Sequence, residues 1–213
     1  PSYSDQANEP QGVPISALIF GGRRSAVAPL VFEALDWEHG VFAAAAVASE
    51  TTAAATGAVG QVRRDPMAMK PFCGYNFADY WTHWLGFKDK SENLPKVFHV
   101  NWFRKDADGN FMWPGFGDNM RVLKWITERC AGQSNAAKTP IGLIPNGSDL
   151  DLSGLDLDQK VVDALLAIDP NIWRTEIEAI EEYFGSFGER IPSEILGQIE
   201  RIKREITESQ RAA

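Results

Sequence analysis

Large aromatic side chains crowd the middle of this 213-residue chain and restrict how it can fold. Between residues 72 and 125, 14 of 54 residues are Phe, Tyr or Trp, whereas aromatic residues make up 11% of the whole sequence. Rings of this size are stable in a core that encloses them or against a ligand that stacks on them. The chain is long enough for one large domain or two small ones with such a core.

Charge and composition exclude several classes of protein. The net charge of −8 comes mostly from residues 151–213, which hold 14 acidic and 7 basic side chains, and this balance argues against general nucleic-acid binding. The longest apolar run, 41–48, is far shorter than the roughly 20 residues of a membrane-spanning helix. Cys73 and Cys130 are the only cysteines, and two cysteines in a chain of this size do not make a disulfide framework. We therefore expect the protein to work in a reducing compartment, the cytoplasm. The first residue, Pro1, suggests a processed product or a piece of something longer.

Apolar patterns predict a mixed α/β (α+β) fold. Strands are expected over 15–20, 40–48, 96–103 and 141–144, although the alanines of 40–48 would suit a helix equally well. Helices are expected over 77–87, 118–130, 155–168, 172–184 and 192–207. In the last of these, isoleucines recur every three or four residues among charges. We expect residues 1–150 to form the main part and 151–213 a helical tail packed on the same domain.

The most informative motif is an aromatic turn over residues 101–119. Asp108-Gly109 is a strong turn signal that would return the chain and bring Phe111 and Phe116 near Phe103. Facing rings form a slot for a flat heterocycle, and the Asn119 amide offers a donor and an acceptor to its edge. The alternative is a hairpin whose aromatic rings simply fill the core.

Two further segments are candidates for binding. Gly21-Gly22-Arg23-Arg24 follows a predicted strand, so glycines would allow close backbone approach and arginines would offer paired donors to phosphate or carboxylate. Residues 49–60 are small and could form a mobile lid. Surface or salt-bridged arginines and a plain surface loop are the respective alternatives. The sequence contains no metal-ligand spacing, phosphate loop or nucleophile elbow, so no complete catalytic apparatus is expected.

These segments together resemble the GTP-dependent phosphoenolpyruvate carboxykinases. The resemblance is carried by GVPISALIFGGRR, SETTAAATG, DPMAMKPFCGYNFADYWTHWL and KVFHVNWFRKDADGNFMWPGFGDNMRVLKW, and it corresponds to the C-terminal third of that family. It implies that Phe103 and Phe116 sandwich guanine, that Phe111 completes the pocket, and that Asn119 reads the guanine edge. It also implies that Arg23 contacts the transferring phosphoryl group. The implied lid consists of Glu50, Thr51, Thr52, Ala53, Ala54, Ala55, Thr56 and Gly57.

The resemblance also implies what this chain lacks. The family converts oxaloacetate and GTP to phosphoenolpyruvate, carbon dioxide and GDP, a gluconeogenic reaction that uses manganese or magnesium. Its phosphate loop, metal ligands and oxaloacetate-binding arginines precede this segment, so the 213 residues alone are expected to be inactive. The parent enzyme is expected to be a cytoplasmic monomer that binds neither membrane nor nucleic acid, with its N-terminal remainder facing this part. The alternatives are a non-catalytic nucleotide-binding module and a structural domain with an aromatic core.

Overall fold

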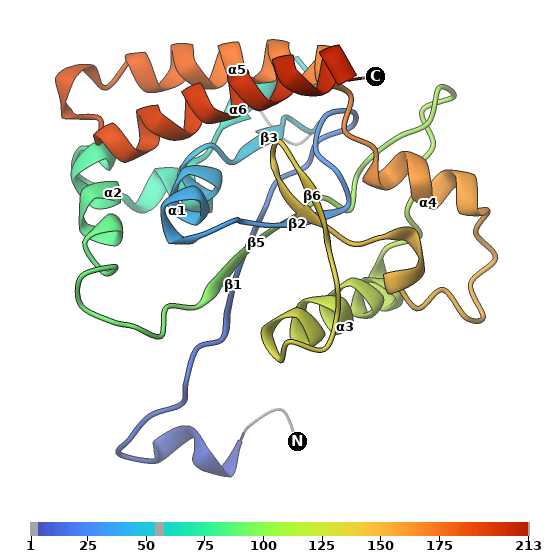
Figure 1. Cartoon of the computed structure of the whole chain (residues 1–213), viewed down its shortest axis with the longest axis horizontal. Helices are drawn as coiled ribbons and strands as arrows, with labels where there is room; N and C mark the ends of the chain where they lie inside the picture. Colours follow the sequence, from blue (N-terminus) through green and yellow to red (C-terminus); the bar gives the residue numbers. More distant parts are fainter. Residues whose placement is uncertain (1–3, 54–57, 213) are drawn as a thin grey trace.

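The sheet at the centre of the molecule carries helices on both faces, as Figure 1 shows. The computed structural model describes residues 4–53 and 58–212. Five strands form a mixed sheet in the order β1-β5-β2-β7-β6, in which β1 and β5 are parallel and the other pairs antiparallel. These strands are β1 Ala17–Gly21, β2 Val31–Glu33, β5 Lys96–Val100, β6 Ala137–Thr139 and β7 Gly142–Ile144. A separate antiparallel pair consists of β3 Ala48–Glu50 and β4 Val62–Arg64.

The helices divide into two groups with separate apolar clusters. One cluster packs between the sheet and α1, α2, α5 and α6, and the other packs against α3 and α4. Side chains alternate between the two faces along β5: Phe98 joins the second cluster, while His99 stacks on Phe32 of the first. The helices are α1 Trp37–Ala45, α2 Phe77–Leu85, α3 Asn119–Cys130, α4 Gln159–Leu166, α5 Pro170–Gly185 and α6 Ser193–Ala212.

The sequence correctly predicted the mixed α/β class, the strands near 15–20, 96–103 and 141–144, and all the expected helices. It was wrong about residues 40–48, which form most of α1 and only the start of β3. The Asp36 carboxylate caps this helix by accepting a hydrogen bond from His39 N, and alanines continue it. Because α1 is buried on nearly every side, its sequence lacks the polar stripe by which a surface helix is recognised.

The helix α3 begins where expected, but its first residues act differently from the expected caps. The Asp118 side chain accepts no backbone hydrogen bond and instead accepts one from Arg121 Nε at 2.9 Å. The Asn119 side chain binds a tryptophan, as described below. Both side chains are therefore used in local side-chain contacts at the start of the helix, with Arg121 and Trp113 respectively.

Candidate functional site

The loop that follows β1 carries the two candidate arginines against the edge of β3. A Cβ atom added to Gly22 would lie 2.0 Å from the carbonyl oxygen of Ala48, so only glycine permits this approach. This close approach of Gly22 to Ala48 brings Arg23 beside Ser49. Arg23 N donates to Ser49 Oγ at 2.9 Å, and an Arg23 guanidinium nitrogen donates to the Glu50 carbonyl oxygen at 3.3 Å.

Arg23 also meets the aromatic turn. Its guanidinium carbon lies 4.8 Å from the centre of the Phe103 ring, within the range of a cation–π contact. The two residues line an open cavity of about 290 Å³ together with Ser49 and Trp102. A guanidinium group and an aromatic ring thus line one hollow.

The first residue of the predicted lid is firmly held. Glu50 Oε1 accepts hydrogen bonds from Ser25 N at 2.7 Å and Ser25 Oγ at 2.8 Å, and Glu50 N donates to the Arg23 carbonyl oxygen at 2.8 Å. Thr51 N donates to the Gln61 carbonyl oxygen at 2.9 Å, which joins the two ends of the segment. The predicted lid residues 54–57 lie outside the described part of the chain.

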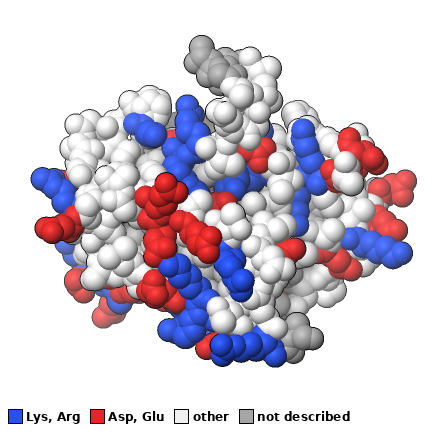
Figure 2. Space-filling view, turned by 90° about the horizontal axis from the view of Figure 1, so that it is seen from above, with Lys and Arg blue, Asp and Glu red and all other residues white. Residues whose placement is uncertain are grey.

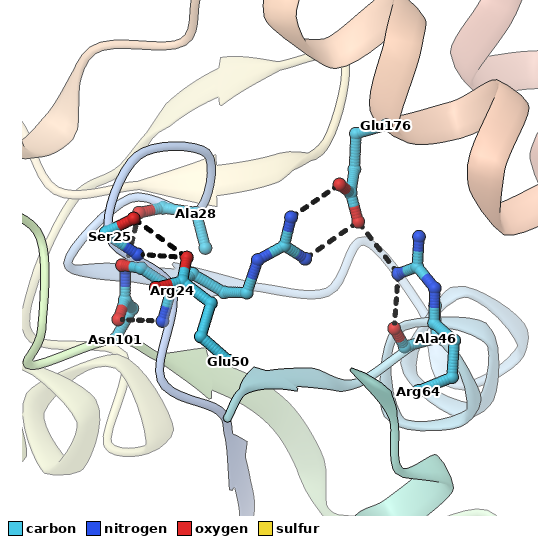
Figure 3. Close-up of polar contacts among 8 residues, drawn as sticks. All are labelled: Arg24, Ser25, Ala28, Ala46, Glu50, Arg64, Asn101 and Glu176. Carbon is cyan, nitrogen blue, oxygen red and sulfur yellow. Dashed lines mark hydrogen bonds and ion pairs between the residues drawn. The ribbon is translucent and has the colours of Figure 1, made fainter. Parts of the chain in front are cut away.

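Arg24 instead enters a buried ion network (Figure 3), so the salt-bridged alternative holds for this arginine, although its partners were not predicted from the sequence. Its guanidinium donates two hydrogen bonds to the Glu176 carboxylate, at 2.8 and 2.6 Å, and Arg64 donates a third to the same carboxylate at 2.8 Å. Arg24 is 6% exposed and Glu176 8%. Burial by itself raises the pKa of Glu176, but the hydrogen bonds and charges of the two arginines outweigh it and hold the pKa below its ordinary value.

The Asp108-Gly109 turn forms, and of the two rings that it was predicted to bring to Phe103 it brings Phe111. Gly109 N donates to the Asp106 carbonyl oxygen at 3.1 Å, and Asp106 N donates to the Asn110 carbonyl oxygen at 3.0 Å. The turn brings the Phe111 ring to 6.0 Å from the Phe103 ring, edge to face at 73°. Backbone hydrogen bonds, chiefly from Asn110, lower the pKa of the Asp106 carboxyl.

The rings of this turn lie largely in solvent rather than in the core. Phe111 is 58% exposed and Phe116 is completely exposed, with no ring contact in the described part of the chain. Phe116 also has a φ of +50°, which is strained for an aromatic residue. The alternative, in which these rings fill the core, is therefore wrong for Phe111 and Phe116, and the core position is taken by Trp113, at 1% exposure.

Asn119 stands at the far end of this turn, where α3 begins. Its Oδ1 accepts a hydrogen bond from Trp113 Nε1 at 2.9 Å, which fixes the amide orientation. Within the described residues, Nδ2, the donor end of the amide, has no hydrogen-bond acceptor. The structure therefore brings Phe103 into contact with both Arg23 and Phe111, whereas no hydrogen bond or ring contact in the described part of the chain joins Phe116 or Asn119 to these three residues.

Two histidines are buried and uncharged, and neither belongs to this hollow. Burial lowers the pKa of His99 to about 4 and that of His39 to about 3, with the charges of Arg24 and Arg201 adding to the respective effects. His39 Nδ1 accepts a hydrogen bond from Leu35 N at 3.0 Å, which requires a neutral ring. Both histidines stack on rings of the first apolar cluster, His99 on Phe32 and His39 on Phe42.

Neither a metal cluster nor a membrane-spanning helix is found in the described residues. Within 4–53 and 58–212, no three His, Cys, Asp or Glu side chains are grouped so that they could hold a metal ion. None of the helices in these ranges is sufficiently long and apolar to cross a bilayer. Figure 2, seen from the side of α5 and α6, shows acidic and basic side chains interspersed instead of one broad basic patch.

Comparison with known proteins places these features in one family. The family model described as "Phosphoenolpyruvate carboxykinase C-terminal P-loop domain" matches residues 1–205. Proteins named phosphoenolpyruvate carboxykinase [GTP] from Chlamydia muridarum and Paenarthrobacter aurescens are 50% and 52% identical to 97% and 91% of the chain. The one from Treponema pallidum is 49% identical over the whole chain. These matches cover 35%, 32% and 35% of the respective relatives, so the chain spans about a third of their length. The chain belongs to the GTP-dependent phosphoenolpyruvate carboxykinase family.

Proposed function

We propose that this chain is the guanine-nucleotide-binding and lid-bearing part of an enzyme that converts oxaloacetate and GTP to phosphoenolpyruvate, carbon dioxide and GDP. The observation that carries the proposal is the Arg23 guanidinium on the Phe103 ring at the edge of an open cavity. Such a pair offers a stacking surface for a base and a positive charge for its phosphates within one site.

The exposed rings of the turn suit a flat ligand that stacks on them. We assign guanine to the space between Phe103 and Phe116, with Phe111 at its side and the free Asn119 Nδ2 at its edge. An amide donor matches the carbonyl oxygen of guanine, whereas adenine presents an amino group at the same ring position. Arg23 would stabilise the negative charge that develops on the transferring phosphoryl group.

Residues 50–57 are proposed to close over the reacting groups. Support comes from the base of the segment, where Glu50 is bonded to Ser25 and to the Arg23 backbone. A closed lid would exclude water from the enolate intermediate, so that it is phosphorylated rather than protonated.

The rest of the reaction would depend on an N-terminal remainder of the same protein. The described residues supply no metal-ligand group, so they do not fit a manganese or magnesium site, and we derive no step through the metal. We further propose that the parent works in the cytoplasm, where its thiols Cys73 and Cys130 stay unpaired as they are here.

Nucleotide binding is tested by tryptophan fluorescence, because Trp102 lines the cavity and Trp113 binds Asn119. GTP and GDP should quench the emission far more strongly than ATP. Phe103→Ala should abolish this response while the far-ultraviolet circular dichroism stays unchanged. The matched control is Phe72→Ala, which removes a ring that is 82% exposed and distant in sequence from the site. Equal quenching by ATP and GTP would contradict the guanine assignment.

The division of labour is tested by a steady-state assay. The isolated 213 residues should show no turnover with oxaloacetate, GTP and manganese, whereas the intact parent enzyme should be active. Turnover by the isolated chain would refute the proposed dependence on the remainder. An inactive parent that still binds GTP would favour the alternative function, a non-catalytic nucleotide-binding module.

A further inference from the structure

The buried amide of Asn101 connects the two halves of the candidate nucleotide site. Asn101 directly follows β5 and is 1% exposed. Its backbone N–H donates to the Leu30 carbonyl oxygen at 3.0 Å, so its main chain continues the line of the sheet. Its side chain is therefore presented from a rigid element rather than from a mobile loop.

All the hydrogen-bonding groups of this amide face the arginine loop or the aromatic turn. Asn101 Nδ2 donates to the carbonyl oxygens of Arg24 at 2.8 Å and of Ala28 at 2.9 Å. Asn101 Oδ1 accepts from Arg24 N and from Phe103 N, each at 3.2 Å. Figure 3 shows the amide lying against the Arg24 backbone.

Few other side chains could replace this arrangement. It needs two donors and a doubly accepting oxygen on one short side chain, which among the natural residues describes an asparagine amide. An aspartate would put a buried carboxylate against two carbonyl oxygens, and a serine would supply one donor instead of two. The amide thus satisfies four backbone groups that would otherwise be buried without partners.

The two segments held by Asn101 carry the groups that meet the two ends of a nucleotide. Arg24 is the neighbour of Arg23, the proposed phosphate contact, and Phe103 is the proposed base contact. The Arg24 side chain is itself fixed by Glu176, so the loop is anchored on both sides of its backbone. Asn101 therefore sets how far the phosphate-binding group stands from the base-binding ring.

We propose that Asn101 is a positioning residue for guanine nucleotides: it fixes the distance between Arg23 and Phe103 so that one ligand can reach both. This inference rests on the proposed function of the same site. A ligand that touches both groups gains affinity because binding at one end places the other end in reach. A ligand that touches only one group gains nothing from the fixed distance.

The test compares three probes in the intact parent enzyme without oxaloacetate: GTP, guanosine and inorganic triphosphate. GTP is used because Arg23 is the proposed contact of the transferring phosphoryl group, which GDP lacks. Asn101→Ala should weaken GTP binding by about tenfold, the effect of losing one to two net hydrogen bonds of positioning. It should weaken guanosine and triphosphate, each of which meets one side only, by less than about twofold. Dissociation constants are measured by calorimetry or by displacement of a fluorescent guanine nucleotide.

A purely structural role is distinguished by a matched control. Ile199→Ala removes a side chain that is 1% exposed in the first apolar cluster, far from this hollow, and should lower the melting temperature without changing the three relative affinities. If Asn101→Ala does not fold, Asn101→Ser keeps a hydroxyl that can accept from Arg24 N and is measured instead.

Each outcome decides the question. If the loss in GTP affinity merely equals the combined losses of guanosine and triphosphate, or if GTP binding is unchanged, Asn101 does not set the distance. If the unaltered enzyme binds triphosphate but neither guanosine nor GTP, the proposed function itself is wrong, and this inference with it.

Discussion

The two sides of the candidate site are built in opposite ways. The arginine loop is held by buried hydrogen bonds and by an ion network in which Arg24, Glu176 and Arg64 are almost inaccessible to water. The aromatic turn instead presents Phe111 and Phe116 to solvent. A side that is already ordered loses little entropy on binding, whereas exposed rings gain stability when a base covers them. We infer that the arginine side fixes geometry and that the aromatic side supplies much of the base-binding energy.

The largest expected effect comes from removing Glu176. Glu176→Ala leaves two buried guanidinium groups without their anion, so the free energy of unfolding should fall by about 3–5 kcal/mol. Chemical denaturation measures this loss. The control is Asp79→Ala, which breaks the mostly exposed pair with Arg190 and should cost at most about 1 kcal/mol. Equal losses in the two variants would mean that burial makes the Glu176 network no stronger than an exposed ion pair.

The stability that the Glu176 carboxylate contributes should depend on pH. Because the pKa of Glu176 in the folded protein lies below its ordinary value of 4.5, its stabilising contribution is complete above pH 4.5. The contribution is lost as the pH falls below 4.5 through the lowered pKa. The difference in stability between the unaltered protein and Glu176→Gln should therefore shrink in that acidic range.

His99, whose charge environment includes Arg24 and Glu176, should produce a second pH effect. Its pKa is about 4 when folded and 6.5 otherwise, so the unfolded chain binds more protons between these values. Stability should fall as the pH drops from 6.5 to 4, by an amount on the order of 3 kcal/mol. His99→Gln should flatten this slope in urea titrations, although His39 still contributes. An unchanged slope in His99→Gln would mean that the ring is already protonated in the fold.

On the aromatic side, changes should affect binding and leave stability untouched. Phe116→Ala removes a fully exposed ring, so the free energy of unfolding should stay within about 0.5 kcal/mol of its original value. The affinity for GDP should fall by about 1–3 kcal/mol, the usual contribution of one stacked ring. Calorimetry with GDP measures the loss, and Phe72→Ala should show none. Unchanged affinity in Phe116→Ala would remove this ring from the site.

Local patterns in the sequence were enough to predict much of the fold. The isoleucines Ile195, Ile199, Ile202 and Ile206 all point into the core, as their spacing indicated. The Asp108-Gly109 turn formed because glycine alone readily adopts the φ of +83° found at Gly109. Helix periodicity and tight turns are set by residues that are close together in the chain, so they can be predicted from the sequence alone.

Features that depend on distant residues could not be predicted in this way. The helix α1 lies directly on β5, where a Cβ atom added to Gly40 would come within 2.6 Å of the Val97 side chain. Because α1 is buried on nearly every side, its sequence has no polar stripe that would identify it as a helix. Arg24 and Glu176 are 152 positions apart. The only local sign of their pairing is a carboxylate on the apolar face of α5, between Trp173 and Ile177.

The smallest predicted effect separates strain from binding at a single residue. Phe116 holds a φ of +50°, a conformation that favours glycine, so Phe116→Gly should raise the free energy of unfolding by up to about 1 kcal/mol relative to Phe116→Ala. Both variants lack the ring and should bind GDP equally weakly. Thermal denaturation and calorimetry on the pair measure the two quantities. If glycine is no more stable than alanine, the backbone there is not strained. If the two variants are equally stable but both bind GDP more weakly than the unaltered protein, the surrounding turn alone holds the Phe116 ring in solvent. The exposure of the ring then accounts for its use in binding without backbone strain.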